Sequence, residues 1–214
     1  MFDIEIFCDK NIRDGERAMI KRAAQLTASL FGCSFILRGS GEWDTEGSYD
    51  IPASCDEIMN EVPEDEKGRK NVSRIMDIMT EVMKARKKSG AMIVFTGDDL
   101  FLKDSWCFGA ARVGKGVSVQ SVARYRSLPE KDMQAVIART LRHEVGHIHR
   151  CAADPERKNT EMKYGRHCTS DGCTMRQSPT LKALLEHAKE EDPKDCLCEL
   201  CREDLERFKK LFYY

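Results

Sequence analysis

The segment His143-Glu144-Val145-Gly146-His147 constrains this chain more than any other feature of its sequence. It places two histidines four residues apart, with a glutamate directly after the first. On an α-helix, positions i and i+4 lie one above the other on the same face, so the two imidazoles can bind one metal ion. This H-E-x-x-H pattern is typical of zinc sites in which the glutamate acts as a general base on a zinc-activated water. The sequence therefore predicts a helix that carries the zinc ligands His143 and His147 and the base Glu144.

The chain before this motif predicts an α/β fold. Residues 2 to 8 alternate like a strand, residues 14 to 32 have apolar side chains at helical spacing, and residues 33 to 37 form a short apolar run. This order predicts two parallel strands joined by a right-handed helical crossover. By the same reasoning, we expect further strands at 91–96, 106–111 and 117–122, the last of them half-buried, and helices at 55–60, 71–88, 129–150, 178–190 and 203–212.

We expect one catalytic domain with two parts. Residues 1–150 would form an α/β subdomain that ends in the motif helix and contains a loop-rich excursion at 39–70. Residues 151–214 would form a C-terminal subdomain in which four cysteines have the spacing of zinc ligands. Because metal binding at such a site is coupled to folding, zinc would stabilise this second part.

Charge and cysteine usage limit the partners and the compartment. The chain has 35 basic and 36 acidic residues, which gives no electrostatic case for a nucleic-acid partner. No apolar run approaches the roughly 18 to 20 residues of a membrane span. The N-terminus lacks the basic start and apolar centre of a secretory signal, so the ten cysteines are expected to be reduced rather than paired in disulfides. We therefore expect a cytoplasmic protein that binds neither nucleic acid nor membrane.

Two further patterns follow the motif. His167-Cys168, Cys173 and Met175 reproduce H-C-x4-C-x-M, and Cys198 and Cys201 form a C-x-x-C pair. In archaemetzincins, these patterns follow H-E-x-x-H-x-x-G-x-x-H in the same order. The chain resembles this family of zinc metallopeptidases over residues 91–201, and before that the resemblance is only architectural.

The resemblance implies a fold, an activity and a set of site residues. It implies a metzincin-like α/β fold, with a mixed, mostly parallel twisted sheet, an antiparallel edge strand and a packed active-site helix. It makes His167 the third ligand of a catalytic zinc and Met175 the turn that forms a hydrophobic floor beneath the histidines. In such clefts, an extended peptide binds along the edge strand, which would be residues 106–111 here.

The spacing of the third ligand departs from the family pattern. Nineteen residues, 148 to 166, separate His147 from His167 where the family has five, which implies an insertion of fourteen. Asp154 is a rival third ligand, because it lies near the usual spacing. We favour His167, since Cys168 and Met175 keep it in the family's register. The loop that carries this insertion, residues 151–166, has many charges and is expected to be exposed and mobile, and the ends of the insertion, Arg150 and Tyr164, are expected to lie close together.

Four cysteines predict a second metal. Cys168, Cys173, Cys198 and Cys201 would form a closed tetrahedral site, which is structural because it leaves no position for water. Cys196 competes with Cys198, and the spacing leaves that choice open. A redox C-x-x-C is the alternative, but such pairs normally follow a strand in a β-α-β unit.

The predicted function is that of a zinc-dependent peptidase with two zinc ions per chain. It would act as a monomer on peptide or protein substrates. The alternatives are a non-catalytic zinc-binding interaction protein on the same fold and a zinc hydrolase of a non-peptide amide. Of the remaining histidines, His149 is expected at the surface, and His187 lies on a charged helix without a ligand-like neighbour.

Overall fold

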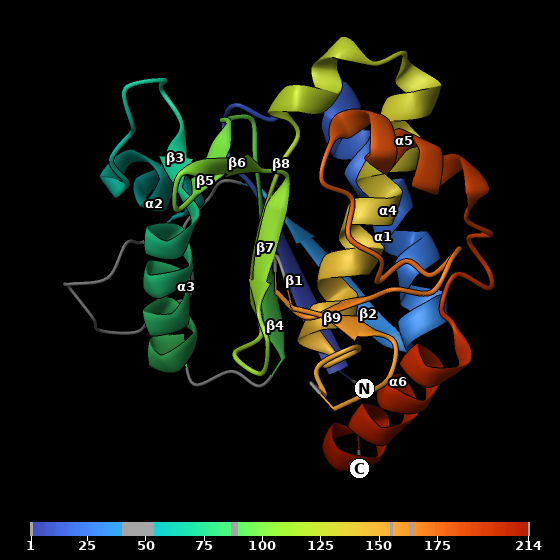
Figure 1. The fold of residues 1–214 in the computed structure, drawn as a ribbon. Coiled ribbons are helices and arrows are strands. Elements are labelled where there is room, and N and C mark those ends of the chain that lie inside the picture. The colour runs from blue at the N-terminus through green and yellow to red at the C-terminus, as the bar shows by residue number, and fades with distance from the viewer. Residues whose placement is uncertain (1, 40–53, 87–89, 155, 163–164, 214) are drawn as a thin grey trace.

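A five-stranded sheet forms the centre of the computed structural model, which describes residues 2–39, 54–86, 90–154, 156–162 and 165–213 (Figure 1). The strand order is β2 (Cys33–Arg38), β1 (Phe2–Cys8), β4 (Ala91–Thr96), β8 (Val117–Ser121) and β7 (Gly109–Arg112). The first four strands are parallel, and β7 pairs with β8 in the antiparallel sense. The predicted mixed, mostly parallel sheet with an antiparallel edge strand is confirmed.

Helices cover both faces of this sheet. On one face lie α1 (Asp14–Phe31) and α4 (Glu130–Ile148), and on the other lie α2 (Cys55–Glu61) and α3 (Val72–Arg86) (Figure 1). Successive strand residues therefore point into different cores: Ile93 packs with the α1 and α4 side, and Met92 and Val94 pack with the α3 side. Strands between two helical layers are buried on both faces and are apolar throughout.

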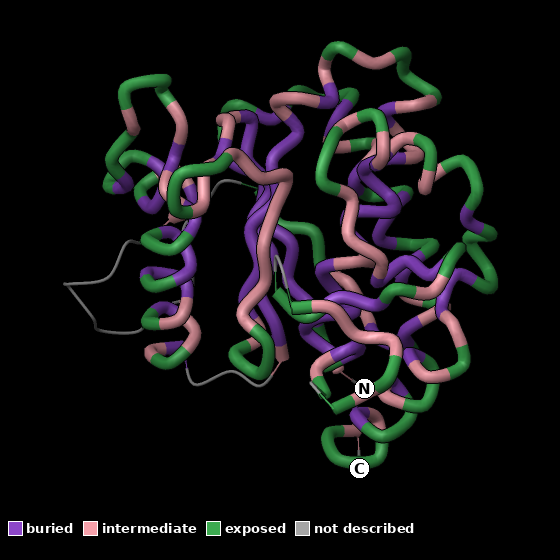
Figure 2. The backbone as a smooth tube through the Cα atoms, in the orientation of Figure 1, coloured by how far each residue is buried: buried purple, intermediate pink, exposed green. Residues whose placement is uncertain are grey.

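This layering corrects the prediction for β8. The strand was expected to be half-buried because its residues alternate, but all five of its residues are buried. Ser118 and Gln120 are among them, because α3 covers the face that would otherwise meet solvent. Figure 2 shows the central strands as buried and the outward sides of the helices as exposed.

The predicted strand at 106–111 is two strands in two different sheets. β6 (Ser105–Cys107) pairs with β5 (Leu100–Leu102), which pairs with β3 (Lys70–Asn71), while β7 belongs to the central sheet. Phe108 separates β6 from β7. The other predicted strands and helices are present with small shifts at their ends, and residues 40–53 of the predicted loop and 87–89 of a predicted helix lie outside the described residues.

The C-terminal segment packs over α4 and α1 (Figure 1). Its elements are short: β9 (Thr160–Glu161), β10 (His167–Cys168), α5 (Leu181–Glu190) and α6 (Glu199–Phe212), the last of which begins four residues before the predicted start. Cys168, Met175 and Leu205 belong to the same apolar core as Ile4 of β1. No described helix is long and apolar enough to cross a membrane. The division into two subdomains stays a prediction.

His149 is not at the surface, as was predicted, but fully buried. Its ring contacts Phe2, Phe31 and Phe208, and its two nitrogens lie 2.8 Å from the carbonyl oxygen of Val145 and 2.9 Å from the hydroxyl of Tyr213. His149 directly follows α4. It was expected to face solvent because it does not lie on the helix face that carries His143 and His147. The C-terminal segment covers this side of α4, and the pattern of α4 alone cannot show that cover.

Candidate metal centres

Helix α4 places His143 and His147 on one face. Their Nε2 atoms are 3.1 Å apart, as expected for side chains one helical turn apart that turn toward a common point. The opposite face of this turn is anchored in the core by Leu141, Val145 and Ile148, which are all buried. The packing of α4 therefore fixes the direction in which the two imidazoles point.

The third imidazole of the cluster comes from β10. His167 Nε2 lies 3.3 Å from His147 Nε2, and the ring of His167 stacks on that of His143 at 5.1 Å between centroids. A zinc ion with nitrogen ligands at about 2.0 to 2.1 Å in tetrahedral geometry would hold them about 3.3 Å apart. The spacing of the three Nε2 atoms thus fits one tetrahedrally bound ion.

Each histidine of the cluster is held in the neutral state that binds metal. His143 Nδ1 donates a hydrogen bond to the carbonyl oxygen of Thr174, at 2.8 Å, which leaves Nε2 free as a lone-pair donor. Burial, with the neighbouring His147 and His167, lowers the pKa of His143 well below its usual value. Burial likewise lowers the pKa of His147 to about 3 and that of His167 to about 4.

Glu144 directly follows His143 on α4, and one oxygen of its carboxylate is unsatisfied within the described part of the chain. The residue is 4% exposed, and its Oε2 atom has no hydrogen-bond partner among the described residues. Burial raises the pKa of Glu144 to about 8. Because an unpartnered buried carboxyl group is costly, its place here indicates a role toward a ligand, a water or a metal.

Met175 packs against the motif helix at Gly146. It is fully buried, and its sulfur lies so close to Gly146 that a Cβ atom at that position would overlap it. The helix can approach the methionine only because the fourth residue of the motif is glycine. The Met175 carbonyl oxygen also accepts a hydrogen bond, 3.0 Å long, from the backbone nitrogen of Cys168. This hydrogen bond ties Met175 to Cys168, which directly follows His167. That Met175 forms a hydrophobic floor beneath the histidines stays a prediction.

Four cysteine sulfurs form a second group. The Sγ atoms of Cys168 and Cys198 are 3.6 Å apart, as are those of Cys173 and Cys201, and all four lie within 4.8 Å of one another. A disulfide would require about 2.05 Å, whereas zinc at about 2.3 Å from each sulfur gives an edge of about 3.8 Å. The arrangement fits a closed tetrahedral metal site.

The structure distinguishes the competing candidate ligands. Cys198, and not Cys196, belongs to the sulfur group. Asp154 is exposed, is not part of the histidine group, and accepts a hydrogen bond of 2.9 Å from the backbone of Glu156. His187 has a partner that was not predicted, since its Nδ1 lies 2.8 Å from the hydroxyl of Ser178.

A buried charge cluster on α4 was not predicted from the sequence. Arg139 and Arg142 both pair with Glu191, and all three residues are buried. Arg139 also donates to the carbonyl oxygen of Arg176, at 3.0 Å, directly after Met175. The cluster attaches α4 to the segment that carries Met175. No spacing rule could have revealed it, because Glu191 follows α5, far away in sequence.

Comparison with known proteins shows the fold. No family model and no curated protein matches the sequence. The crystal structure of an archaemetzincin from Methanopyrus kandleri matches with a TM-score of 0.68 at 17% identity, over 98% of this chain and 96% of the other. The chain has the archaemetzincin fold. A zinc-dependent peptidase from Methanocorpusculum labreanum has a TM-score of 0.62 at 16% identity, over 94% of this chain and 99% of the other.

A second archaemetzincin, from Archaeoglobus fulgidus in complex with malonate, also has a TM-score of 0.62, at 17% identity over 95% of this chain and 99% of the other. The archaemetzincin fold therefore spans nearly the whole chain, including the first 90 residues, where the sequence resemblance was only architectural. That the loop at 151–166 carries an insertion relative to the family stays a prediction, and Tyr164, one of its two predicted ends, lies outside the described residues.

Proposed function

We propose that this protein is a zinc-dependent peptidase whose catalytic site is formed by His143, His147, His167 and Glu144. The observation that supports this most directly is the position of Glu144. Its carboxyl group is buried, its Oε2 atom has no hydrogen-bond partner among the described residues, and it directly follows His143, one of three imidazoles whose Nε2 atoms have the spacing of a tetrahedral zinc site. A purely structural site would not need a carboxylate beside its ligands.

The residues of the site divide the work of hydrolysis. Zinc held by the three histidines would supply Lewis-acid activation of the attacking water and of the scissile carbonyl group. Glu144 would accept the proton of that water and pass it to the leaving amine. Burial alone raises the pKa of Glu144 to about 8, and a zinc ion held by the neighbouring histidines would lower it and so favour the carboxylate form that a general base requires.

The edge of β7 is the proposed docking strand for the substrate. β7 is the last strand of the central sheet, and within the described residues no strand pairs with its outer edge. It packs against α4, the helix that carries Glu144. An extended peptide that added to this edge would be aligned by main-chain hydrogen bonds. We therefore propose a peptide or protein substrate, bound antiparallel to residues 109–112.

The four-cysteine group is proposed as a second, structural zinc site. With four protein ligands, it leaves no position for water. Its sequence neighbours belong to the catalytic site: His167 precedes Cys168, and Met175 follows Cys173 by two residues. The second zinc would therefore hold the third catalytic ligand and the methionine floor in place, and the chain would bind two zinc ions.

Substitution of Glu144 tests the proposed function. Glu144→Gln keeps the shape of the side chain but removes the base, so hydrolysis of an unfolded protein substrate should fall by about 10² to 10⁴. Zinc content, measured by atomic emission, should stay at the wild-type level. Glu156→Gln, at an exposed position of the following loop, is the matched control and should keep full activity. Wild-type turnover in Glu144→Gln would reject the assignment.

A screen of substrates separates peptidase activity from other amide hydrolysis. The zinc-loaded protein should cleave peptides and should lose this activity when the zinc is removed by a chelator. Cleavage of non-peptide amides alone would leave the zinc chemistry in place but replace the proposed substrate.

A further inference from the structure

The loop between His147 and His167 is not the solvated excursion that its composition predicts. Its charged residues divide into two sets: Asp154 and Glu156 are exposed, but the side chain of Arg157 is only 8% exposed. β9, which lies in the loop, pairs with β10, the strand that carries Cys168. Part of the loop is therefore packed against the four-cysteine group, and only part of it faces solvent.

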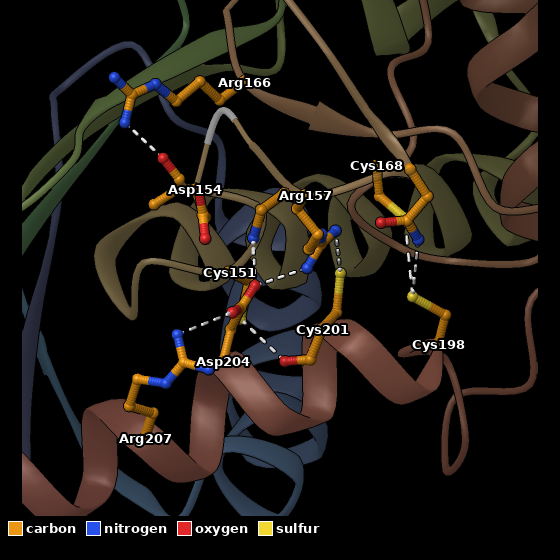
Figure 3. A network of polar contacts seen from close by, with 12 residues as sticks. Cys151, Asp154, Arg157, Arg166, Cys168, Cys198, Cys201, Asp204 and Arg207 are labelled. Carbon is orange, nitrogen blue, oxygen red and sulfur yellow. Dashed lines mark hydrogen bonds and ion pairs between the residues drawn. The ribbon is translucent and has the colours of Figure 1, made fainter.

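Arg157 joins this loop to a cysteine sulfur. Its Nη2 atom lies 3.3 Å from Cys201 Sγ, and its Nη1 atom forms an ion pair of 2.5 Å with Asp204 (Figure 3). Asp204 also accepts a hydrogen bond, 2.9 Å long, from the backbone nitrogen of Ala152, at the start of the loop. The carboxylate thus fixes the planar guanidinium so that its second nitrogen points at the sulfur.

Asn159 contacts two other sulfurs of the same group. Its Nδ2 atom lies 3.4 Å from Cys168 Sγ and 3.8 Å from Cys198 Sγ, and it donates to the hydroxyl of Ser170 at 2.8 Å. Cys173 Sγ accepts from the backbone nitrogen of Cys198, at 3.5 Å. Cys168 Sγ also accepts from the backbone nitrogen of Ser170, at 3.4 Å. Each of the four sulfurs therefore lies within reach of an N–H donor. Because one of the two amide hydrogens of Asn159 is used by Ser170, Asn159 can donate to one sulfur at a time, Cys168 being the nearer.

The charge of the site explains why such donors matter. Four thiolates around a divalent ion leave a net charge of −2, which is costly in a buried place unless it is balanced or hydrogen-bonded. Hydrogen bonds from charged donors are about twice as strong as those between neutral groups. Arg157 supplies such a bond, and its position over Cys201 also covers that sulfur on the loop side.

We propose that Arg157 and Asn159 are positioning residues that retain the metal of the four-cysteine site, so that the loop between the second and third histidines acts as its clamp. The proposal rests on the proposed binding of metal by the four cysteines. It assigns the part of the loop that contacts the cysteine sulfurs a role in metal retention that does not depend on substrate. Outer-shell partners of this kind typically change metal affinity by about 10-fold to 100-fold.

Cobalt substitution gives a direct test. In the full-length protein loaded with Co²⁺, thiolate-to-cobalt charge-transfer absorption reports only the cysteine-bound ion, and its decay after addition of excess EDTA measures the release of that ion. Arg157→Met should speed this decay by about 10-fold, and Asn159→Ala should speed it to a smaller extent. Arg157→Lys keeps the charge and should restore part of the retention.

Controls separate this inference from the function on which it rests. Lys158→Met, at an exposed neighbouring position, should decay as the wild type does, and circular dichroism should show that all variants are folded. A wild-type protein without the charge-transfer band would reject metal binding by the cysteines. A wild-type band that decays at the same rate in Arg157→Met and Asn159→Ala would overturn the role of the loop alone. If Arg157→Met does not fold, Arg157→Lys and Asn159→Ala decide the matter.

Discussion

The two halves of the molecule are stabilised in different ways. The sheet and its four covering helices bury long apolar stretches on both faces, so that β1, β4 and β8 are almost entirely inaccessible to solvent. In the segment from 151 to 198, the described residues form two strands of two residues each and one helix, α5. Its cysteines, its buried ion pairs and its hydrogen bonds to sulfur replace regular structure there. The stability of the C-terminal part therefore depends on specific polar and metal-binding side chains, whereas that of the sheet and its helices depends on the burial of apolar residues.

Removal of the cysteine-bound metal should have the largest effect and should separate the two halves. Cys168→Ser or Cys201→Ser should roughly halve the bound zinc and lower the melting temperature, because the apparent binding energy of a structural zinc is on the order of 10 kcal/mol in small zinc peptides. Hydrogen exchange should rise in residues 156–205 far more than in β1 and β4. A zinc-free wild-type protein that melts at the temperature of the zinc form would contradict the comparison.

Loss of the third histidine should affect the catalytic site without affecting the sulfur site. His167→Ala should abolish tight binding of the first zinc, because only two of its three ligands remain, while the second zinc stays bound. Asp154→Ala is the control and should leave both ions in place, since Asp154 is exposed and lies outside the histidine group. Zinc content and peptidase activity together check this. A loss of zinc in Asp154→Ala alone would reverse the ligand assignment.

Substitution of Gly146 tests the contact between the two halves. In a helix, Gly→Ala normally stabilises by about 1 kcal/mol. Here the added Cβ would overlap the sulfur of Met175, so Gly146→Ala should instead destabilise the protein by about 1 to 3 kcal/mol. Chemical denaturation measures this. In the double variant with Met175→Ala, the two effects should not add, because the overlap is removed. If the changes in unfolding free energy of the two single variants simply add, the Met175 side chain does not clash with a Cβ atom at position 146.

The smallest expected effect is the loss of stability of the metal-free protein over the first pH unit below 6.5, which is about 1 kcal/mol for one buried histidine. Burial lowers the pKa of His149 from its usual 6.5 to about 4. Below pH 6.5, the unfolded chain takes up a proton that the folded protein does not, so the stability that the neutral imidazole contributes is lost as the pH falls from 6.5 toward 4. His149→Phe should flatten this part of the stability profile. An equal slope in the two proteins would assign the loss to other groups.

Most of the first half could be predicted from its sequence. The apolar runs at 2–8, 33–37 and 91–96 and the helical spacing at 14–32 correspond to β1, β2, β4 and α1. The predictions fail where the burial or the pairing of a strand depends on elements that are distant in sequence. β8 is buried on both faces because α3 lies against it, and β6 and β7 separate at Phe108 because they belong to different sheets. Neither fact is present in the local pattern of the strand.

The sequence predicts those residues of the candidate site whose spacing along the chain is typical of metal ligands. His143, Glu144 and His147 are given by a five-residue motif, and His167 and the cysteines by a resemblance in their order. The partners of these residues could not be found in this way. Arg157 and Glu191 contact their targets across long stretches of chain, and Asn159 reaches the distant Cys198 as well as the nearby Cys168. Their identity as charged or polar residues predicts exposure. Only the folded structure shows that these particular side chains are turned inward.

Three consecutive residues, Cys173, Thr174 and Met175, serve both sites: a sulfur of the four-cysteine group, the carbonyl oxygen that orients His143, and the side chain that packs against Gly146. Cys198 and Cys201 follow every catalytic residue in chain order. Under the proposed function, the order of synthesis would therefore set the order of assembly. A growing chain that already displays His143, Glu144 and His147 would lack the parts that align them, so hydrolytic activity would arise only after the second sulfur pair has emerged and closed around its ion.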